Sequence, residues 1–109
     1  MSYKIEVTEK FERDVRKLSK KHKSLLADLM AFREQLRSDP NQGAFLGKDC
    51  YKIRLAISSK GKGKRGGGRV ITCVKVVQET VYLLAIYDKA ERESISDNEL
   101  DDMLADAGL

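Results

Sequence analysis

Apolar side chains recur with two different periods along the first forty residues. Tyr3, Ile5 and Val7 alternate with charged residues, a pattern that predicts a short strand. Two segments with helical spacing follow, with apolar positions at Phe11, Val15 and Leu18 in the first and at Leu25, Leu29, Phe32 and Leu36 in the second. Pro40 ends the second segment, because a proline disfavours helical conformation in the residue before it. The pattern predicts a strand and then an antiparallel helical hairpin.

Stretches rich in β-branched and aromatic residues come next and predict strands over residues 50–58, 69–77 and 80–87. A last helix is expected over residues 96–107, where Ser96 and Glu99 have the spacing of a capping box. The order predicts an α+β domain: an N-terminal strand and helical hairpin, a three-stranded antiparallel meander, and a C-terminal helix. At 109 residues the chain has the length of a single domain, 1–109.

The alternation within the three later strands suggests how they pair. If Ser58 opposes Arg69 in the first hairpin and Val77 opposes Thr80 in the second, one face of the sheet is almost wholly apolar. That predicted core face holds Tyr51, Ile53, Leu55, Ile57, Val70, Thr72, Val74, Val76, Val81, Leu83, Ala85 and Tyr87.

The opposite face collects basic side chains and is expected to be open. In the same register Lys52 opposes Lys75, and Arg69 opposes Asp88. Two like charges directly opposed are unfavourable unless solvent or an anion relieves them. The sequence therefore predicts that basic groups converge on one open face and one edge of the sheet.

Charge is unevenly distributed along the chain. Residues 1–90 hold 20 basic and 10 acidic side chains, whereas residues 91–109 hold one basic and seven acidic side chains. The densest basic stretch is 60–69, with five cations, five glycines and no acid. Such a surface suits a polyanion, and nucleic acid is the first candidate. Charge alone, however, is more commonly just a solvated surface.

The glycines at 61, 63 and 66 match the pattern GxGxxG. A strand rather than a helix follows them, which excludes a dinucleotide fingerprint, and the lysine and hydroxyl residue of a P-loop are missing. Glycines let the backbone approach a ligand, and the interleaved cations supply charge for phosphate. The alternative is a hairpin loop with no ligand.

Other chemistry is limited by what the chain contains. His22 is the only histidine and is expected at the surface between the two helices. No His, Cys and carboxylate set has the spacing of metal ligands, so neither metal nor cofactor is expected. Cys50 and Cys73 fall four residues apart along the predicted sheet, too far for a disulfide. With no long apolar segment and a charged N-terminus, we expect a cytoplasmic protein that binds no membrane.

Three segments resemble the RelE/ParE toxin superfamily, and most closely its HigB-type members. They are Tyr-Lys-Ile-Arg at 51–54, the glycine- and lysine-rich residues 59–72, and residues 82–96, which include Tyr-Asp-Lys-Ala-Glu-Arg. The resemblance extends over nearly the whole chain, and that family's small α+β fold has the order of elements predicted above. Its members are toxins of type II toxin–antitoxin modules.

The resemblance implies one expected activity and two alternatives. RelE- and HigB-like members are ribosome-dependent, metal-independent endoribonucleases that cut mRNA and inhibit translation, and we expect this function. ParE-like members poison DNA gyrase instead, and a catalytically decayed nucleic-acid-binding module is the third possibility. The expected partners are the ribosome, its mRNA and a cognate antitoxin, a helix-turn-helix protein.

The resemblance also implies catalytic residues. The arginine at the start of the family's third strand matches Arg69, which is expected to stabilise charge in the transition state. Lys89 matches the first residue of a basic pair and is the candidate acid or second phosphate clamp. The second cation of that pair is replaced by Ala90, and a C-terminal tyrosine by Ser96. Tyr87 is a possible substitute, but the predicted register points it into the core.

Further cations are candidates for the base and for RNA contacts. Lys64 is the candidate base, because neighbouring cations make a lysine lose its proton more readily; Lys60 and Lys62 are alternatives. The RNA- and phosphate-binding set is Lys52, Arg54, Lys60, Lys62 and Arg65. The acidic segment 91–109 is expected either as a solvated, capped helix or as a flap over the basic face.

Overall fold

A computed structural model describes residues 2–109, whose elements follow the predicted order with one addition before the meander and two within it. The elements are β1 (Lys4–Val7), α1 (Glu9–Ser19), α2 (Leu25–Ser38), β2 (Ala44–Gly47), β3 (Cys50–Leu55), the 3₁₀ turn η1 (Ser58–Lys60), α3 (Gly63–Gly66), β4 (Gly68–Lys75), β5 (Thr80–Asp88) and α4 (Asp97–Asp106). The predicted α+β class is confirmed, and β2, η1 and α3 are the parts that the sequence pattern missed.

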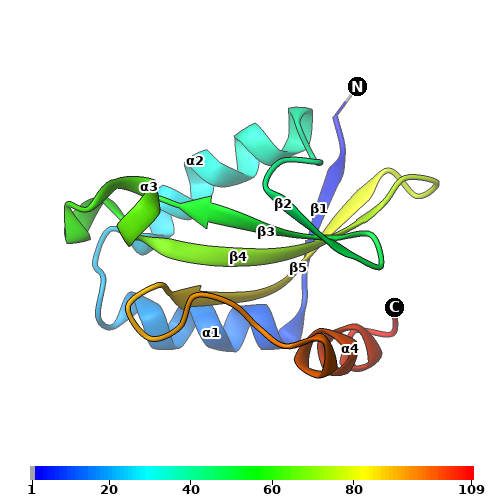
Figure 1. Cartoon of the computed structure of the whole chain (residues 1–109). Coiled ribbons are helices and arrows are strands. Elements are labelled where there is room, and N and C mark those ends of the chain that lie inside the picture. The colour runs from blue at the N-terminus through cyan, green and yellow to red at the C-terminus, as the bar shows by residue number, and fades with distance from the viewer. Residues whose placement is uncertain (1) are drawn as a thin grey trace.

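The strands form one sheet in the order β1-β5-β4-β3-β2 (Figure 1). β1 runs parallel to β5, and the other neighbouring pairs are antiparallel. Thr8 caps the start of α1: its hydroxyl oxygen accepts a hydrogen bond from the Phe11 N–H, and its O–H donates one to the Leu83 carbonyl. The same cap therefore starts the helix and fixes it to β5.

The predicted pairing of the first hairpin is wrong by four residues. Cys50 opposes Cys73, and Arg54 opposes Arg69, because the chain leaves the sheet at Leu55 and forms η1 and α3 before β4 begins. Lys52 opposes Ile71 and not Lys75, so the predicted like-charge pair does not exist. An even-numbered offset leaves each side chain on its predicted face, because the side-chain period in a strand is two.

The second hairpin departs from prediction in two ways: Lys75 rather than Val77 opposes Thr80, an offset of two residues, and a bulge follows. Val74 opposes Val81, and the register then shifts beyond Thr72, so that Arg69 opposes Tyr87 rather than Asp88. An extra residue in one strand changes which face the following side chains occupy. Ala85 and Tyr87, which were predicted in the first core, therefore lie on the second face of the sheet. Ile86 lies in the first core instead. Val76, also predicted in the core, is exposed.

Apolar cores lie on both faces of the sheet. The first core packs Phe11, Leu18, Leu25, Phe32 and Leu36 of the helical hairpin against Ile53, Leu55, Ile57, Val70, Val74, Val81, Leu83 and Ile86. The second core packs Leu100 and Met103 of α4 against Cys50, Ile71, Cys73, Leu84 and Ala85. The prediction of a wholly open second face is wrong, because α4 covers its apolar half.

This packing also corrects the predicted position of the two cysteines. Cys50 and Cys73 are cross-strand neighbours rather than four residues apart, and both are buried free thiols. Within residues 2–109, none of the helices has the length and apolar character needed to cross a membrane.

Leu36→Ala should lower the free energy of unfolding by about 2–5 kcal/mol, because Leu36 is fully buried in the first core and its loss leaves a cavity. Leu26→Ala is the matched control on the same helix: its side chain is 59% exposed, and the loss should be under about 1 kcal/mol. Urea unfolding followed by circular dichroism measures both. Equal losses would contradict the inward face assigned to α2.

Candidate functional site

The predicted site lies at the edge of the sheet where β3 ends and β4 begins. The chain between these two strands forms η1 and α3 (Figure 1). This glycine- and lysine-rich segment is folded into turns rather than an open hairpin loop. Gly61 and Gly63 have φ angles of 68° and 64°, which side chains disfavour. At Gly67 a Cβ atom would lie 2.1 Å from the carbonyl oxygen of Leu55. The glycines therefore allow a tight turn against the sheet.

Arg69 lies beneath this turn, with only 1% of its surface exposed. Its Nη1 donates to the carbonyl oxygens of Lys64 (3.3 Å) and Gly68 (3.0 Å), and its Nη2 donates to that of Arg65 (3.1 Å). Its Nε is buried and has no hydrogen-bond partner among the residues that the structure describes. The turn thus surrounds a buried positive charge with carbonyl oxygens.

Glu93 supplies the negative charge that faces this guanidinium. A Glu93 carboxylate oxygen lies 3.1 Å from Nη2 of Arg69, and the Glu93 side chain is 53% exposed. Its backbone carbonyl accepts hydrogen bonds from the Lys52 amine and the Tyr87 hydroxyl, both at 3.3 Å. Desolvation tends to raise the pKa of Glu93, but the charge and hydrogen bond of Arg69 outweigh it and hold that pKa below its usual value. Glu93 is therefore ionised at neutral pH.

Tyr87 opposes Arg69 across the sheet and does not point into the first core as predicted. Burial raises the pKa of Tyr87, although the charges of Arg92 and Arg69 act in the opposite direction. The guanidinium carbon of Arg92 lies 5.5 Å from the Tyr87 ring centroid, and its nitrogens bind both carboxylate oxygens of Glu99. Arg92 thus places a cation near Tyr87, although the second cation of the family's basic pair is replaced by Ala90.

His22, Asp88 and Lys60 form a buried ionic cluster beside the turn. His22 Nε2 lies 2.8 Å from one Asp88 oxygen, and the Lys60 amine lies 2.5 Å from the other. Desolvation tends to raise the pKa of Asp88, but hydrogen bonds from Lys60, the Ala90 N–H and His22 lower it to about 2. The prediction that His22 is a surface residue is wrong, since its side chain is only 15% exposed.

The helical hairpin holds the turn from a second side. Both carboxylate oxygens of Asp28 on α2 accept hydrogen bonds from Ser58, from its N–H at 2.8 Å and its hydroxyl at 2.6 Å. The hydroxyl of Ser24 lies 2.9 Å from that of Ser59 and accepts from the Ser59 N–H at 2.8 Å. The turn is therefore anchored to α2 as well as to β5.

The predicted site residues separate into two groups. Lys52 and Arg54 lie on β3, on the same face as Arg69, and Arg54 directly opposes Arg69. Lys60 lies apart from them, because its amine binds Asp88 and the Gly67 carbonyl. The Lys60 side chain therefore fastens the turn to Asp88 at the end of β5.

The other predicted cations surround the turn. Lys62, Lys64 and Arg65 are exposed on and beside α3, and Lys64 shares a cavity of about 150 Å³ with Arg54. Lys89 is exposed just beyond β5, and its N–H donates to the Gly67 carbonyl. The structure therefore places all eight predicted site residues at or near one end of the sheet, and Lys60 differs from the others because its amine is paired with Asp88.

The acidic C-terminal segment combines the two expectations stated for it. α4 is a capped helix that packs through Leu100 and Met103, and its acids face mostly outward. The contact with the basic face comes from Glu93, in the connection before α4. Sequence reasoning missed Glu93 and Arg92, although the alternating charges of residues 91–93 offered a signal.

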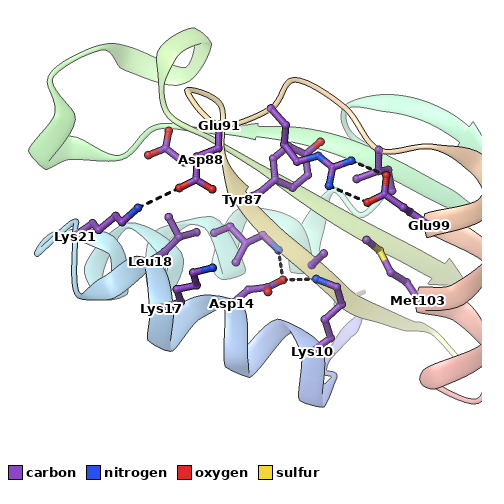
Figure 2. Close-up of a pocket in the computed structure, with 14 residues that line it drawn as sticks. Lys10, Asp14, Lys17, Leu18, Lys21, Tyr87, Asp88, Glu91, Glu99 and Met103 are labelled. Atoms are coloured by element: carbon purple, nitrogen blue, oxygen red, sulfur yellow. Dashed lines mark hydrogen bonds and ion pairs between the residues drawn. The ribbon is translucent and has the colours of Figure 1, made fainter.

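A separate cavity of about 200 Å³ lies between α1, β5 and α4 (Figure 2). Lys10 and Lys17 line it along α1, and Lys21, just beyond that helix, binds Glu91 at 3.2 Å. Asp14 accepts a hydrogen bond from the Ile86 N–H in the shifted part of β5. Within residues 2–109, no three His, Cys, Asp or Glu side chains are grouped to hold a metal ion.

Asp88→Asn should lower the free energy of unfolding at neutral pH by about 2 kcal/mol, the energy of a pKa shift from 3.8 to about 2. Because the folded-state pKa is depressed, this contribution is present above pH 4 and disappears as the pH falls toward 2. Urea unfolding across that range measures it. Asp102→Asn, at an exposed position on α4, is the control. A difference between wild type and Asp88→Asn that stays constant from pH 6 to 2 would contradict the assignment.

Comparisons with known proteins agree with this fold. Three similar solved structures are a double-arginine mutant of the E. coli toxin RelE in the free state (TM-score 0.61, 19% identity, covering 99% of this chain and 96% of that chain), the toxin–antitoxin complex RelBE2 from Mycobacterium tuberculosis (0.58, 18%, 81% and 99%) and the isolated E. coli RelE toxin (0.51, 21%, 95% and 98%). At these identities the structures show a shared fold. Residues 3–108 match the family model described as the RelE toxin of the RelE/RelB toxin–antitoxin system. The chain belongs to the RelE toxin family.

Proposed function

We propose that this chain is the toxin of a type II toxin–antitoxin pair and cuts mRNA on the ribosome without a metal ion. The observation that carries the proposal is the buried Arg69, which has Lys52 and Arg54 beside it on one face of the sheet. Membership of the RelE family and the fold shared with toxins solved alone and with an antitoxin support it. The HigB-type likeness stays a prediction.

RNA cleavage without a metal ion needs a base, an acid and a cation that stabilises the charge on the phosphate. In cleavage by the neighbouring ribose 2′-hydroxyl, that oxygen attacks phosphorus, a base takes its proton, the bond to the 5′-oxygen breaks, and an acid protonates that oxygen. Arg69 is placed to stabilise the extra negative charge on the phosphate, since guanidinium and phosphate pair through two hydrogen bonds. Lys52 and Arg54 hold the flanking phosphates in this proposal, and Lys64 remains the candidate base.

Tyr87 is the best-placed group to replace the tyrosine missing at Ser96. It opposes Arg69, and its raised pKa keeps the hydroxyl protonated at neutral pH. A protonated hydroxyl suits the role of acid toward the leaving oxygen. Lys89 is exposed beyond β5 and fits the second phosphate clamp of the sequence prediction.

A partner antitoxin is part of the proposal. Two of the similar solved structures contain RelE-type toxins with an antitoxin or an antitoxin peptide. By this likeness we expect a cognate antitoxin to bind and neutralise this chain. The helix-turn-helix fold of that antitoxin rests on the sequence resemblance alone.

Arg69→Ala should reduce mRNA cleavage on ribosomes by at least about 100-fold, the usual cost of removing one group that stabilises transition-state charge. Wild type, Arg69→Ala, Lys52→Ala and Arg16→Ala are induced in bacteria, with growth scored and mRNA ends mapped. Arg16 is exposed on α1 and serves as the matched cation control. We expect growth arrest and new ends within translated frames for wild type and Arg16→Ala only.

Because Arg69 is buried, the purified variant must first give the circular dichroism spectrum of the wild type. Lys52→Ala, which removes a cation at the sheet surface, tests the site even if Arg69→Ala fails to fold. Cuts that continue at the wild-type rate in both variants would contradict the site. Arrest without cuts would indicate gyrase or another target, and no arrest would indicate a decayed module.

A further inference from the structure

We propose that the Glu93 carboxylate occupies, in the free protein, the position at which an RNA phosphate binds Arg69, so that Glu93 and RNA compete for one guanidinium. The inference rests on the proposed function, since it concerns the same site. It assigns to one residue, Glu93, a competition that the sequence suggested only for the acidic segment 91–109 as a whole.

The hydrogen bonds of Arg69 show which of its partners can leave. Three go to backbone carbonyl oxygens of the turn and of β4, which are fixed by the fold. The remaining partner is the Glu93 side chain, which is half exposed and belongs to the connection between β5 and α4. In Figure 1 this connection, drawn in orange, runs back along the sheet to α4. Glu93 is therefore the partner that can move without unfolding the sheet.

The unused donor of Arg69 indicates what kind of anion fits. Both Glu93 oxygens contact Nη2, at 3.1 and 3.4 Å, whereas the buried Nε has no partner among the described residues. A phosphate presents several oxygens and commonly binds a guanidinium through two nitrogens at once. A phosphodiester in place of Glu93 would supply Nε with the acceptor that it lacks.

The buried charge makes the two occupants mutually exclusive. A guanidinium at 1% exposure is costly without a nearby anion, so the position does not stay empty. Two anions at one Nη2 would repel each other. Lys52 is already bound to the Glu93 carbonyl, so an arriving phosphate would compete for this cation as well. Departure of Glu93 thus frees two of the cations that the proposed function requires.

The test compares binding of one RNA by two variants of equal charge. The probe is a short single-stranded RNA with 2′-O-methyl groups throughout, which cannot be cleaved because the attacking hydroxyl is blocked. Glu93→Gln should bind it about tenfold more tightly than wild type, since one charge-assisted competitor is removed. Glu91→Gln is the matched control, since the Glu91 carboxylate pairs with Lys21 just beyond α1, and it should bind less than about threefold more tightly. Equal gains in the two variants would overturn the proposal.

Thermal melts give a second measurement that does not depend on RNA. Glu93→Gln leaves Arg69 without its anion, so its melting temperature should fall in chloride and recover in inorganic phosphate of equal ionic strength. Wild type and Glu91→Gln should respond less to phosphate. A Glu93→Gln protein that shows no more recovery in phosphate than the control would overturn the competition.

Cleavage on ribosomes separates this inference from the proposed function. If no variant cleaves mRNA but Glu93→Gln gains RNA affinity, the competition stands and the nuclease proposal fails. If wild type cleaves and Glu93→Gln loses cleavage without gaining affinity, the competition fails and the carboxylate takes part in the reaction instead.

Discussion

The burial of one guanidinium determines how the end of the sheet must be built. Removing a charge from water costs several kcal/mol unless hydrogen bonds and an opposite charge replace the solvent, which is about the whole stability margin of a small domain. The turn supplies the hydrogen bonds, because it directs the carbonyl oxygens of Lys64 and Arg65 at Arg69. The same turn requires glycine at position 67, because a Cβ atom there would collide with the Leu55 carbonyl oxygen. The glycine-rich sequence follows from the position of Arg69.

Two buried cations lie at this end of the sheet, and they differ in their counter-charges. Lys60 is paired with Asp88, and both side chains are at least nine-tenths buried, so this pair is shielded from salt and water. Arg69 is paired with Glu93, which is half exposed. The first arrangement suits a permanent contact that holds the turn. The second suits a charge whose partner is exchanged, because one side of the pair is accessible to solvent and to ligands.

The sequence predicted the faces of the sheet better than its register. Alternation of apolar residues fixes which side chains share a face, and the four-residue error in pairing was even-numbered, so it left those faces intact. The true hairpin was hidden because the residues between Leu55 and Gly68 form turns that have no periodic pattern. The bulge in β5 was equally hidden, since residues 81–87 are apolar throughout and offer no polar marker of a change in face.

The placement of the candidate cations could be predicted where strand position alone decides it. Lys52, Arg54 and Arg69 share a face because their strands are adjacent, which alternation alone predicts. The pairing of His22 with Asp88 could not be predicted, since 66 residues separate them and only the folded hairpin brings them together. A lone histidine among lysines carries no local signal of a buried acidic partner.

The second face of the sheet combines a structural half and a charged half, and one chain segment joins them. α4 covers the apolar half, whereas the segment before it carries Glu93 to the charged half. Arg92 binds both carboxylate oxygens of Glu99, which also closes the capping box at the start of α4. The residue next to Glu93 is thus fastened to α4. Arg92 therefore connects the segment that carries Glu93 to the first turn of α4.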